Sequence, residues 1–311
     1  MVSKAPKPLE ASGGRGHDRL GTDLSALRAS YDDLAADYER IFPDWRESSR
    51  RQGGALDRLM RTELTDRLRP GPYRVLDCAA GIGTQALALA ELGHRVVASD
   101  VSYLALRRLT HGERGRVATG SATGGATDDT TDDTTDDGAG NAASGGTSNL
   151  AGALVADMRR LPVADASVDV VVCADNSLPH LLTPADVVAA LGEMRRVAVP
   201  GGLVLVSTRD YDEARRTRPG ATPVQVSRDE AGLTATFQVW TWHDDGEHYD
   251  YDHLMLIGDG PGWRVGHRTG TYWAVTRAEL SALAVQAGLA GVRWLLPEET
   301  GFFQPLLLAR T

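Results

Sequence analysis

The order of apolar and polar positions along the chain is that of an α/β protein. An apolar run at 74–77 ends in an acid, and a loop containing two glycines follows it. Residues 86–92 favour a helix, and a second apolar run at 95–99 ends in Asp100. This order of strand, glycine turn, helix, strand and acid predicts the first unit of a parallel sheet.

Five further runs extend this pattern toward the C-terminus. The run at 168–174 is nearly continuous in apolar residues, which is typical of a strand buried on both faces. Helices are predicted between the runs, with Thr183 and Thr276 as N-caps. We therefore predict a Rossmann-like sheet of seven strands that ends in an antiparallel hairpin. The five runs are 154–157, 168–174, 203–207, 292–296 and 305–309.

Two segments outside this pattern predict additional layers. Helical spacing at 24–38 and again at 46–68 predicts an N-terminal helical cap over 25–70, after a disordered tail at 1–24. Within 208–273 the period changes to that of strands joined by tight turns, and four of the six tryptophans lie there. We predict an antiparallel insertion on the substrate side of the main domain, which spans 71–311.

Residues 117–151 consist almost wholly of Gly, Ala, Ser, Thr and Asp, with a repeated Thr-Thr-Asp-Asp unit. So little apolar surface cannot offset the entropy lost on ordering, so we predict a disordered insertion. The alternative is a Ca²⁺ site on its six aspartates. The tract lacks the glycine and terminal glutamate of a loop with defined calcium geometry, and we expect no metal.

Composition excludes several classes of protein. The 311 residues are 42% hydrophobic and 24% charged, and no apolar run is long enough to span a membrane. The N-terminus lacks the apolar core of a signal peptide, so we expect a cytoplasmic protein. The net charge is −9, of which six charges lie in the aspartate tract, so there is no basic footprint for nucleic acid. Cys78 and Cys173 are expected to be buried, reduced thiols.

The strand–loop–strand unit carries the chemistry of a nucleoside pocket. Gly81 and Gly83 let the backbone approach a ligand, and the following helix offers unpaired N–H groups. Asp100 can accept hydrogen bonds from both ribose hydroxyls, because an ionised carboxylate has two acceptor oxygens. These residues alone predict that a nucleoside is bound.

The sequence resembles the class I S-adenosylmethionine (SAM)-dependent methyltransferases. The resemblance rests on 75–83, Asp100, Asp157-Met158 and Pro200-Gly201-Gly202, and on the helix before the final hairpin. It covers roughly 70–311 apart from the low-complexity insertion. Ala79-Ala80 departs from the family's loop, in which a glycine and a cysteine are common.

The resemblance implies a SAM pocket with defined contacts. Asp77 would lie near the cationic end of the cofactor, Asp157 would accept from the adenine amino group, and Met158 would pack on its ring. Either Arg51 or, as the alternative, Arg50 would pair with the cofactor's carboxylate. The implied cofactor-binding residues are Tyr31, Trp45, Arg51, Asp77, Ala79, Gly81, Gly83, Asp100, Asp157, Met158, Asn176 and His180.

Within the family the sequence looks most similar to glycine N-methyltransferase and its small-amine relatives. Local features that indicate this branch are 175–180, 209–212 and the aromatic N-terminal helices. The resemblance implies that Arg209 binds an acceptor carboxylate, with Asn176, Tyr249 and Tyr251 as further polar contacts. Tyr249 and Tyr251 share one face of a strand, so ordinary packing is the competing interpretation. Tyr38 is interpreted as helix packing.

The partner expected from this reading is a small-molecule methyl acceptor, and a homo-oligomer is possible. No catalytic dyad is required, since a neutral amine attacks an activated sulfonium once the two are aligned. Alternatives are O- or C-methylation in a natural-product pathway, and a SAM-binding protein without catalysis. An NAD-dependent dehydrogenase is a further alternative, because 81–86 formally meets the dinucleotide pattern.

Overall fold

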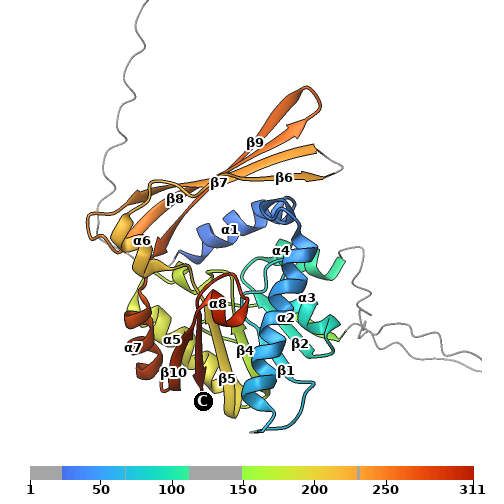
Figure 1. Ribbon diagram of the computed structural model, residues 1–311, viewed down its shortest axis with the longest axis vertical. Helices are drawn as coiled ribbons and strands as arrows, with labels where there is room; N and C mark the ends of the chain where they lie inside the picture. Colours follow the sequence, from blue (N-terminus) through green and yellow to red (C-terminus); the bar gives the residue numbers. More distant parts are fainter. Residues whose placement is uncertain (1–22, 67, 112–148, 230–231) are drawn as a thin grey trace, which may run out of the picture.

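The computed structural model describes residues 23–66, 68–111, 149–229 and 232–311. These residues form a mixed sheet with helices on both faces, and a second, antiparallel sheet stands over one end of it (Figure 1). Residues 1–22 of the predicted tail and most of the predicted insertion at 117–151, including its aspartates, lie outside the described residues. The last two residues of the predicted tail are ordered, because Asp23 caps the first helix and Leu24 begins it.

The main sheet has seven strands in the order β10-β11-β5-β4-β1-β2-β3. All neighbours pair in parallel except β11, which is antiparallel to both β5 and β10. The predicted sheet and its final antiparallel hairpin are therefore confirmed. The strands are β1 (Arg74–Asp77), β2 (Arg95–Asp100), β3 (Leu150–Val155), β4 (Val168–Cys173), β5 (Ala198–Ser207), β10 (Ala290–Leu295) and β11 (Leu306–Arg310).

Alternate side chains of the central strands enter two apolar cores. Leu76, Val171 and Val204 pack with α5 (Pro184–Val197) and α7 (Arg277–Gln286). Their neighbours, Val75 and Val170 among them, pack on the other face with three helices. Because both faces are covered, the strands read as continuous apolar runs. The three helices are α2 (Trp45–Leu64), α3 (Ala86–Glu91) and α4 (Tyr103–His111).

Several element boundaries differ from those predicted. Strand β3 begins at Leu150, four residues early and inside the predicted insertion, because Leu150 is buried and pairs with Val96. Here pairing with β2 overrides a weak local strand preference. Strand β5 begins at Ala198 and continues through the predicted turn. At Gly202 a Cβ would lie 2.8 Å from the Val199 carbonyl oxygen, so only glycine fits.

The N-terminal helices also divide differently. Helix α1 (Leu24–Leu34) ends before Tyr38, which opens a separate 3₁₀ turn, η1 (Tyr38–Ile41). Helix α2 then begins at Trp45, where the side chain of Asp44 accepts from the Glu47 N–H. Tyr31 of α1 and Tyr38 of η1 both pack against the cluster that Leu34 forms with Met255 of the second sheet.

The second sheet contains four antiparallel strands in sequence order. The three predicted strands of this region are confirmed, and an additional strand and the helix α6 (Tyr211–Thr217) were not predicted. In Figure 1 this sheet lies above α1 and leaves its opposite face turned outward. The strands are β6 (Gln225–Asp229), β7 (Gly232–Trp242), β8 (His248–Asp259) and β9 (Gly262–Trp273).

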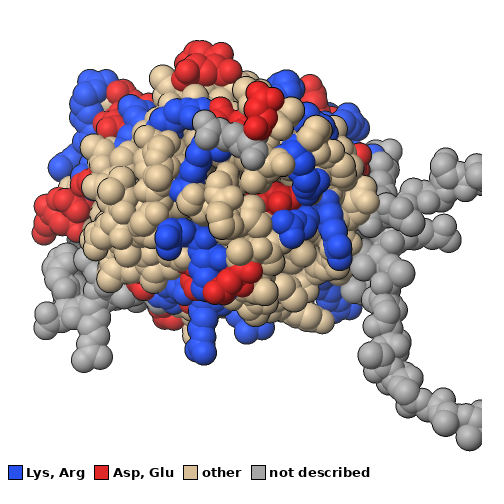
Figure 2. Space-filling model, turned by 90° about the horizontal axis from the view of Figure 1, so that it is seen from below, with Lys and Arg blue, Asp and Glu red and all other residues tan. Residues whose placement is uncertain are grey.

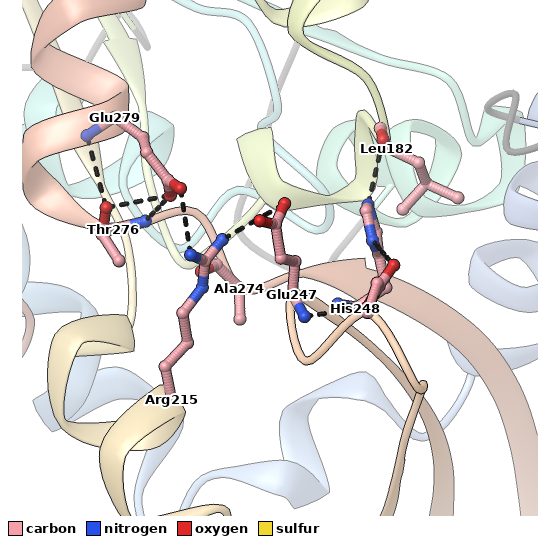
Figure 3. Close-up of polar contacts among 8 residues, drawn as sticks. Leu182, Arg215, Glu247, His248, Ala274, Thr276 and Glu279 are labelled. Atoms are coloured by element: carbon pink, nitrogen blue, oxygen red, sulfur yellow. Dashed lines mark hydrogen bonds and ion pairs between the residues drawn. The ribbon is translucent and has the colours of Figure 1, made fainter.

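Arg215 of α6 fixes the second sheet to the main domain (Figure 3). Its Nε donates to the carbonyl of Ala274, directly after β9, at 2.7 Å, and its Nη1 bonds the Glu279 carboxylate of α7 at 2.9 Å. At the start of β8, His248 Nε2 lies 3.1 Å from the carbonyl of Leu182, which follows η2 (Leu178–His180). These contacts set the second sheet's position relative to the C-terminal edge of the main sheet.

Glu279 also completes the predicted capping box with Thr276 at the start of α7. A short helix, α8 (Pro297–Thr300), joins β10 to β11. Cys78 and Cys173 are buried free thiols, as predicted. None of the helices in the described ranges combines the length and the apolar content that crossing a bilayer requires. On the face opposite the second sheet, basic and acidic side chains are interspersed (Figure 2).

Candidate functional site

The loop between β1 and α3 is held in a conformation that requires glycine. Gly81 and Gly83 have φ values of 53° and 96°, in the left-handed region. A Cβ on Gly83 would lie 2.9 Å from side-chain atoms of Leu87 and Leu109. The loop is covered from α2, where the Trp45 indole N–H donates to the Thr84 hydroxyl at 3.0 Å.

Asp100 joins this loop to the end of β2. One of its carboxylate oxygens accepts from the Gly81 N–H and the other from the Ser102 N–H, both at 2.8 Å. Each oxygen retains a further lone pair for a ligand hydroxyl. Burial raises the pKa of Asp100, and the backbone hydrogen bonds act in the opposite direction. The carboxylate is therefore fixed in place, as a ribose-binding group requires.

Asp77 lies behind the loop and is fully buried. Its Oδ1 accepts from the Ala79 N–H at 3.3 Å, but its Oδ2 has no hydrogen-bond partner in the described structure. Burial raises its pKa to about 7, with the charge of Asp100 also raising it. A buried acid with an unpartnered oxygen fits a cationic ligand, which would satisfy that oxygen and favour the ionised form.

A cavity beside the loop gathers six of the residues predicted to bind the cofactor. Apolar side chains of α1 form its opposite wall, through Leu24 and Leu27. The six predicted residues are Tyr31, Ala79, Asp100, Asp157, Met158 and His180. The Asp157 carboxylate accepts from the Arg159 N–H at 2.9 Å and forms an ion pair with its guanidinium, so this acid has a structural partner within the chain.

Arg50 and Arg51 are both exposed on α2 and line neither this cavity nor its neighbour. Neither of the two candidates for the predicted carboxylate-binding arginine therefore lies at the cavity. Trp45, Gly81 and Gly83 form the loop and its cover rather than the cavity wall.

A second cavity lies between η1, the end of β4 and the second sheet. Arg209, the second residue after β5, lines it and donates from Nη1 to the Gln238 side chain at 2.9 Å and to the Tyr249 hydroxyl at 3.1 Å. Its guanidinium lies over the rings of Trp240 and Tyr272, with centroids at 5.1 and 5.4 Å. In the described part of the chain it forms no ion pair with a carboxylate within 4.0 Å.

Of the other predicted acceptor contacts, some line the second cavity and one supports Arg209. Tyr251 lines the second cavity, whereas Tyr249 packs on Trp240 and holds Arg209 from behind. Asn176 lines the cavity and is held at both ends of its amide: its Oδ1 accepts from the Arg209 N–H at 3.0 Å, and its Nδ2 donates to the Tyr211 hydroxyl at 2.9 Å.

Tyr31 and Tyr38 line both cavities and form the wall between them. The Tyr31 hydroxyl lies 2.8 Å from His180 Nε2. Burial lowers the pKa of His180 to about 3, so its imidazole is neutral at physiological pH. The pKa of Tyr38 is raised chiefly by burial and then by the charges of Asp175 and Asp100. Tyr38 therefore lies within electrostatic reach of an acid from each cavity.

Sequence reasoning missed several of the residues that form the second cavity. Tyr38 was interpreted as helix packing; it does pack against Leu34 of α1, and it also lines both cavities. Gln238 and Tyr272 come from strands whose pairing sets their position, and no local pattern marks them. Asp175 adjoins a predicted contact and follows a strand, so its place at the carboxyl edge of the sheet was a usable signal.

Comparison with known proteins identifies the domain. Residues 76–206 match the family model described as a methyltransferase domain. Residues 76–206 therefore carry a methyltransferase domain. The seven-strand order with its reversed β11 agrees with this assignment, and the match decides against the NAD-dependent dehydrogenase. SAM is the cofactor of this methyltransferase, and the unpartnered oxygen of Asp77 and the fixed carboxylate of Asp100 fit it.

Solved structures of other methyltransferases share the fold. The CcbJ methyltransferase from Streptomyces caelestis is 18% identical with a TM-score of 0.64, covering 91% of this chain and 98% of that one. CalS10, an amino pentose methyltransferase from Micromonospora echinaspora, is 20% identical with a TM-score of 0.61, covering 95% and 100%. The sugar N-methyltransferase KedS8 from a Streptoalloteichus species is 16% identical with a TM-score of 0.60, covering 98% and 99%. A search of the curated proteins gives no match.

Proposed function

We propose that this methyltransferase transfers a methyl group to the nitrogen of a small amine that also carries an anionic group, as an amino acid does. The observation that supports this most directly is Arg209, a guanidinium in the second cavity that has no carboxylate partner in the described structure. Its planar fork binds a carboxylate through two parallel hydrogen bonds. The second cavity is then the acceptor cavity.

The arrangement of the two cavities supports the same proposal. The acceptor cavity and the cofactor cavity share two lining residues, Tyr31 and Tyr38. SAM supplies an activated methyl group, so the chain has to align the acceptor and exclude water. The two tyrosines and the half-buried Arg209 do both. The helical cap covers the cofactor in this proposal, and the second sheet closes the acceptor side.

An amine acceptor also agrees with two neighbours in fold, which are named as methyltransferases of an amino pentose and of a sugar nitrogen. We also propose that the protein belongs to the glycine N-methyltransferase-like branch, on the basis of Asn176, Arg209 and Tyr211. In either branch the nucleophile is a nitrogen.

The test is methylation of a panel comprising glycine, β-alanine, ethanolamine and glucosamine, with S-adenosylhomocysteine production and product mass spectra as readouts. We expect turnover of the acids, and Arg209→Ala should lower kcat/KM for them by about 10–100-fold, the loss of charge-assisted hydrogen bonds. Arg216→Ala is the control, because Arg216 is an exposed arginine of α6 paired only with Glu213 in the described residues.

Equal activity of Arg209→Ala and the wild type on the acids would remove Arg209 as the acceptor anchor. Methylation of oxygen or carbon in the product would replace the N-methyltransferase. Tight cofactor binding with no product from any acceptor would favour a non-catalytic SAM-binding protein.

A further inference from the structure

Asp175 occupies an unusual place in the acceptor cavity. It is the second residue after β4, and it and Asn176 have φ values of 57° and 63°. Left-handed conformations are unfavourable for non-glycine residues, although Asp and Asn tolerate them best. Two consecutive residues in this conformation persist only where the surrounding structure fixes them, and such residues cluster at functional sites.

The backbone of this pair is fixed from β5 and beyond. The Asp175 N–H donates to the Ser207 hydroxyl at 2.8 Å, and that hydroxyl donates to the Gln304 side chain at 2.8 Å. On the other side Asn176 accepts from the N–H of Arg209. These bonds hold the Asp175 side chain at the cavity, and they use none of its carboxylate oxygens.

The carboxylate of Asp175 therefore lines the acceptor cavity with no hydrogen bond or ion pair in the described structure. Burial raises its pKa to about 6, and the charge of Arg209 acts in the opposite direction. The other titratable groups that sense this charge are Tyr38 of η1, Tyr272 of β9 and Asp77 of β1. An acid and a guanidinium in one cavity complement a ligand that carries both an ammonium and an anionic group.

We propose that Asp175 binds the ammonium form of the acceptor and takes its proton before methyl transfer. This inference rests on the proposed function, because it requires an amine acceptor. One N–H bond of the ammonium breaks, its electron pair stays on nitrogen, and the proton moves to a carboxylate oxygen of Asp175. The freed lone pair forms the N–CH₃ bond as the S–CH₃ bond breaks, with that electron pair left on sulfur. Asp175 then returns the proton to solvent.

The histidines of the two cavities do not supply this function. Burial lowers the pKa of His180 to about 3 and that of His253 to about 4. His180 Nε2 already forms a hydrogen bond with the Tyr31 hydroxyl, and His253 Nε2 forms one with the Thr236 hydroxyl at 2.7 Å. Neither imidazole changes charge near pH 6, so an acid limb there reports a carboxylate.

The test is Asp175→Asn, which keeps the shape of the side chain and a residue type that tolerates the left-handed backbone. It is compared with Asp165→Asn, a change at an exposed acid paired with Arg196. At saturating SAM, which holds Asp77 ionised, kcat/KM of the wild type for the best amine of the panel should fall as pH drops through about 6. Asp175→Asn should lose that limb and lower kcat by about 100-fold or more, the range of general-base catalysis.

A second readout needs no turnover. In protein labelled with [4-¹³C]aspartate and saturated with S-adenosylhomocysteine, the carboxyl signal absent from Asp175→Asn should titrate near pH 6. Adding the same amine should lower that midpoint, because an ammonium partner favours the charged form. An unmoved midpoint together with full kcat in Asp175→Asn overturns the role of Asp175 and leaves the proposed function standing. A wild type that methylates no amine overturns both.

Discussion

Alanine substitutions at two adjacent glycines of α2 should differ sharply in their effect on stability. Gly53 is buried, and a Cβ built on it would lie closer to the Cβ of Ala88 than two carbon atoms approach, and 3.3 Å from the Ala88 carbonyl carbon. Ala88 belongs to α3 and has no side-chain torsion through which to move aside. The nearest atom to a Cβ on Gly54 is the flexible end of Arg58, at 3.5 Å.

The magnitudes follow from two terms. Replacing glycine by alanine inside a helix gains about 1 kcal/mol through backbone entropy, and this gain applies at both positions. Forcing a methyl group into the contact between α2 and α3 costs about 1–3 kcal/mol, and this cost applies only to Gly53→Ala. Gly54→Ala should therefore stabilise the protein, and Gly53→Ala should be less stable than Gly54→Ala by about 1–3 kcal/mol.

Urea unfolding followed by circular dichroism measures both free energies of unfolding, and calorimetry with S-adenosylhomocysteine measures the functional consequence. Moving α3 disturbs the glycine loop, since Ser49 donates to the Thr84 carbonyl and Gln85 donates to Gln52. Gly53→Ala should therefore weaken ligand binding as well, whereas Gly54→Ala should not. If Gly53→Ala proves as stable as Gly54→Ala, the packing argument is wrong.

Two further predictions concern the acids of the cofactor cavity. Asp100→Asn should weaken S-adenosylhomocysteine binding by about 10–100-fold in calorimetry, because it removes a charged acceptor and sets an NH₂ group against the Gly81 or Ser102 N–H; an unchanged Kd would argue against ribose binding. Asp77 has its pKa raised to about 7, so in the ligand-free protein it stabilises the fold below its ordinary pKa and that stability is lost as pH rises toward 7. The melting temperature of ligand-free wild type should fall between pH 5 and 8 relative to Asp77→Asn, and parallel melting curves would contradict this; the mutant should gain less from added SAM.

The elements predicted well from the sequence are those whose signals are local. The strand β1, its glycine loop and the strand β2 combine apolar runs, turn residues and a terminal acid within 27 positions, 74–100. The capping box at Thr276 is equally local. The start of β3 at Leu150 depends on pairing with β2, which is distant in the sequence. Strand β6 pairs with the next strand, β7, but four of its five residues are polar, so no apolar pattern marks it.

The same distinction applies to the site. Asp100 could be predicted because it follows its loop at a characteristic spacing, and the structure bonds it to Gly81. Tyr38 could not, since its role depends on α1 ending at Leu34 and on the second sheet lying over it. The cofactor cavity takes part of its lining from the contiguous β1–β2 unit, through Cys78, Ala79, Asp100 and Val101. The acceptor cavity has no such unit and is assembled from α1, η1, the segments after β4 and β5, and β7 to β9.

The charges of the two cavities affect how tightly the methyl donor and its product are bound. Asp77 senses the charges of both Asp100 and Asp175, so three carboxylates share one region, and burial raises the pKa of each. A cation among them relieves both the burial and the mutual repulsion. SAM carries a sulfonium charge that S-adenosylhomocysteine has lost, so methyl transfer removes one of the charges that the acids stabilise. The same carboxylates that favour the donor therefore weaken retention of the product, and the difference grows as rising pH ionises them.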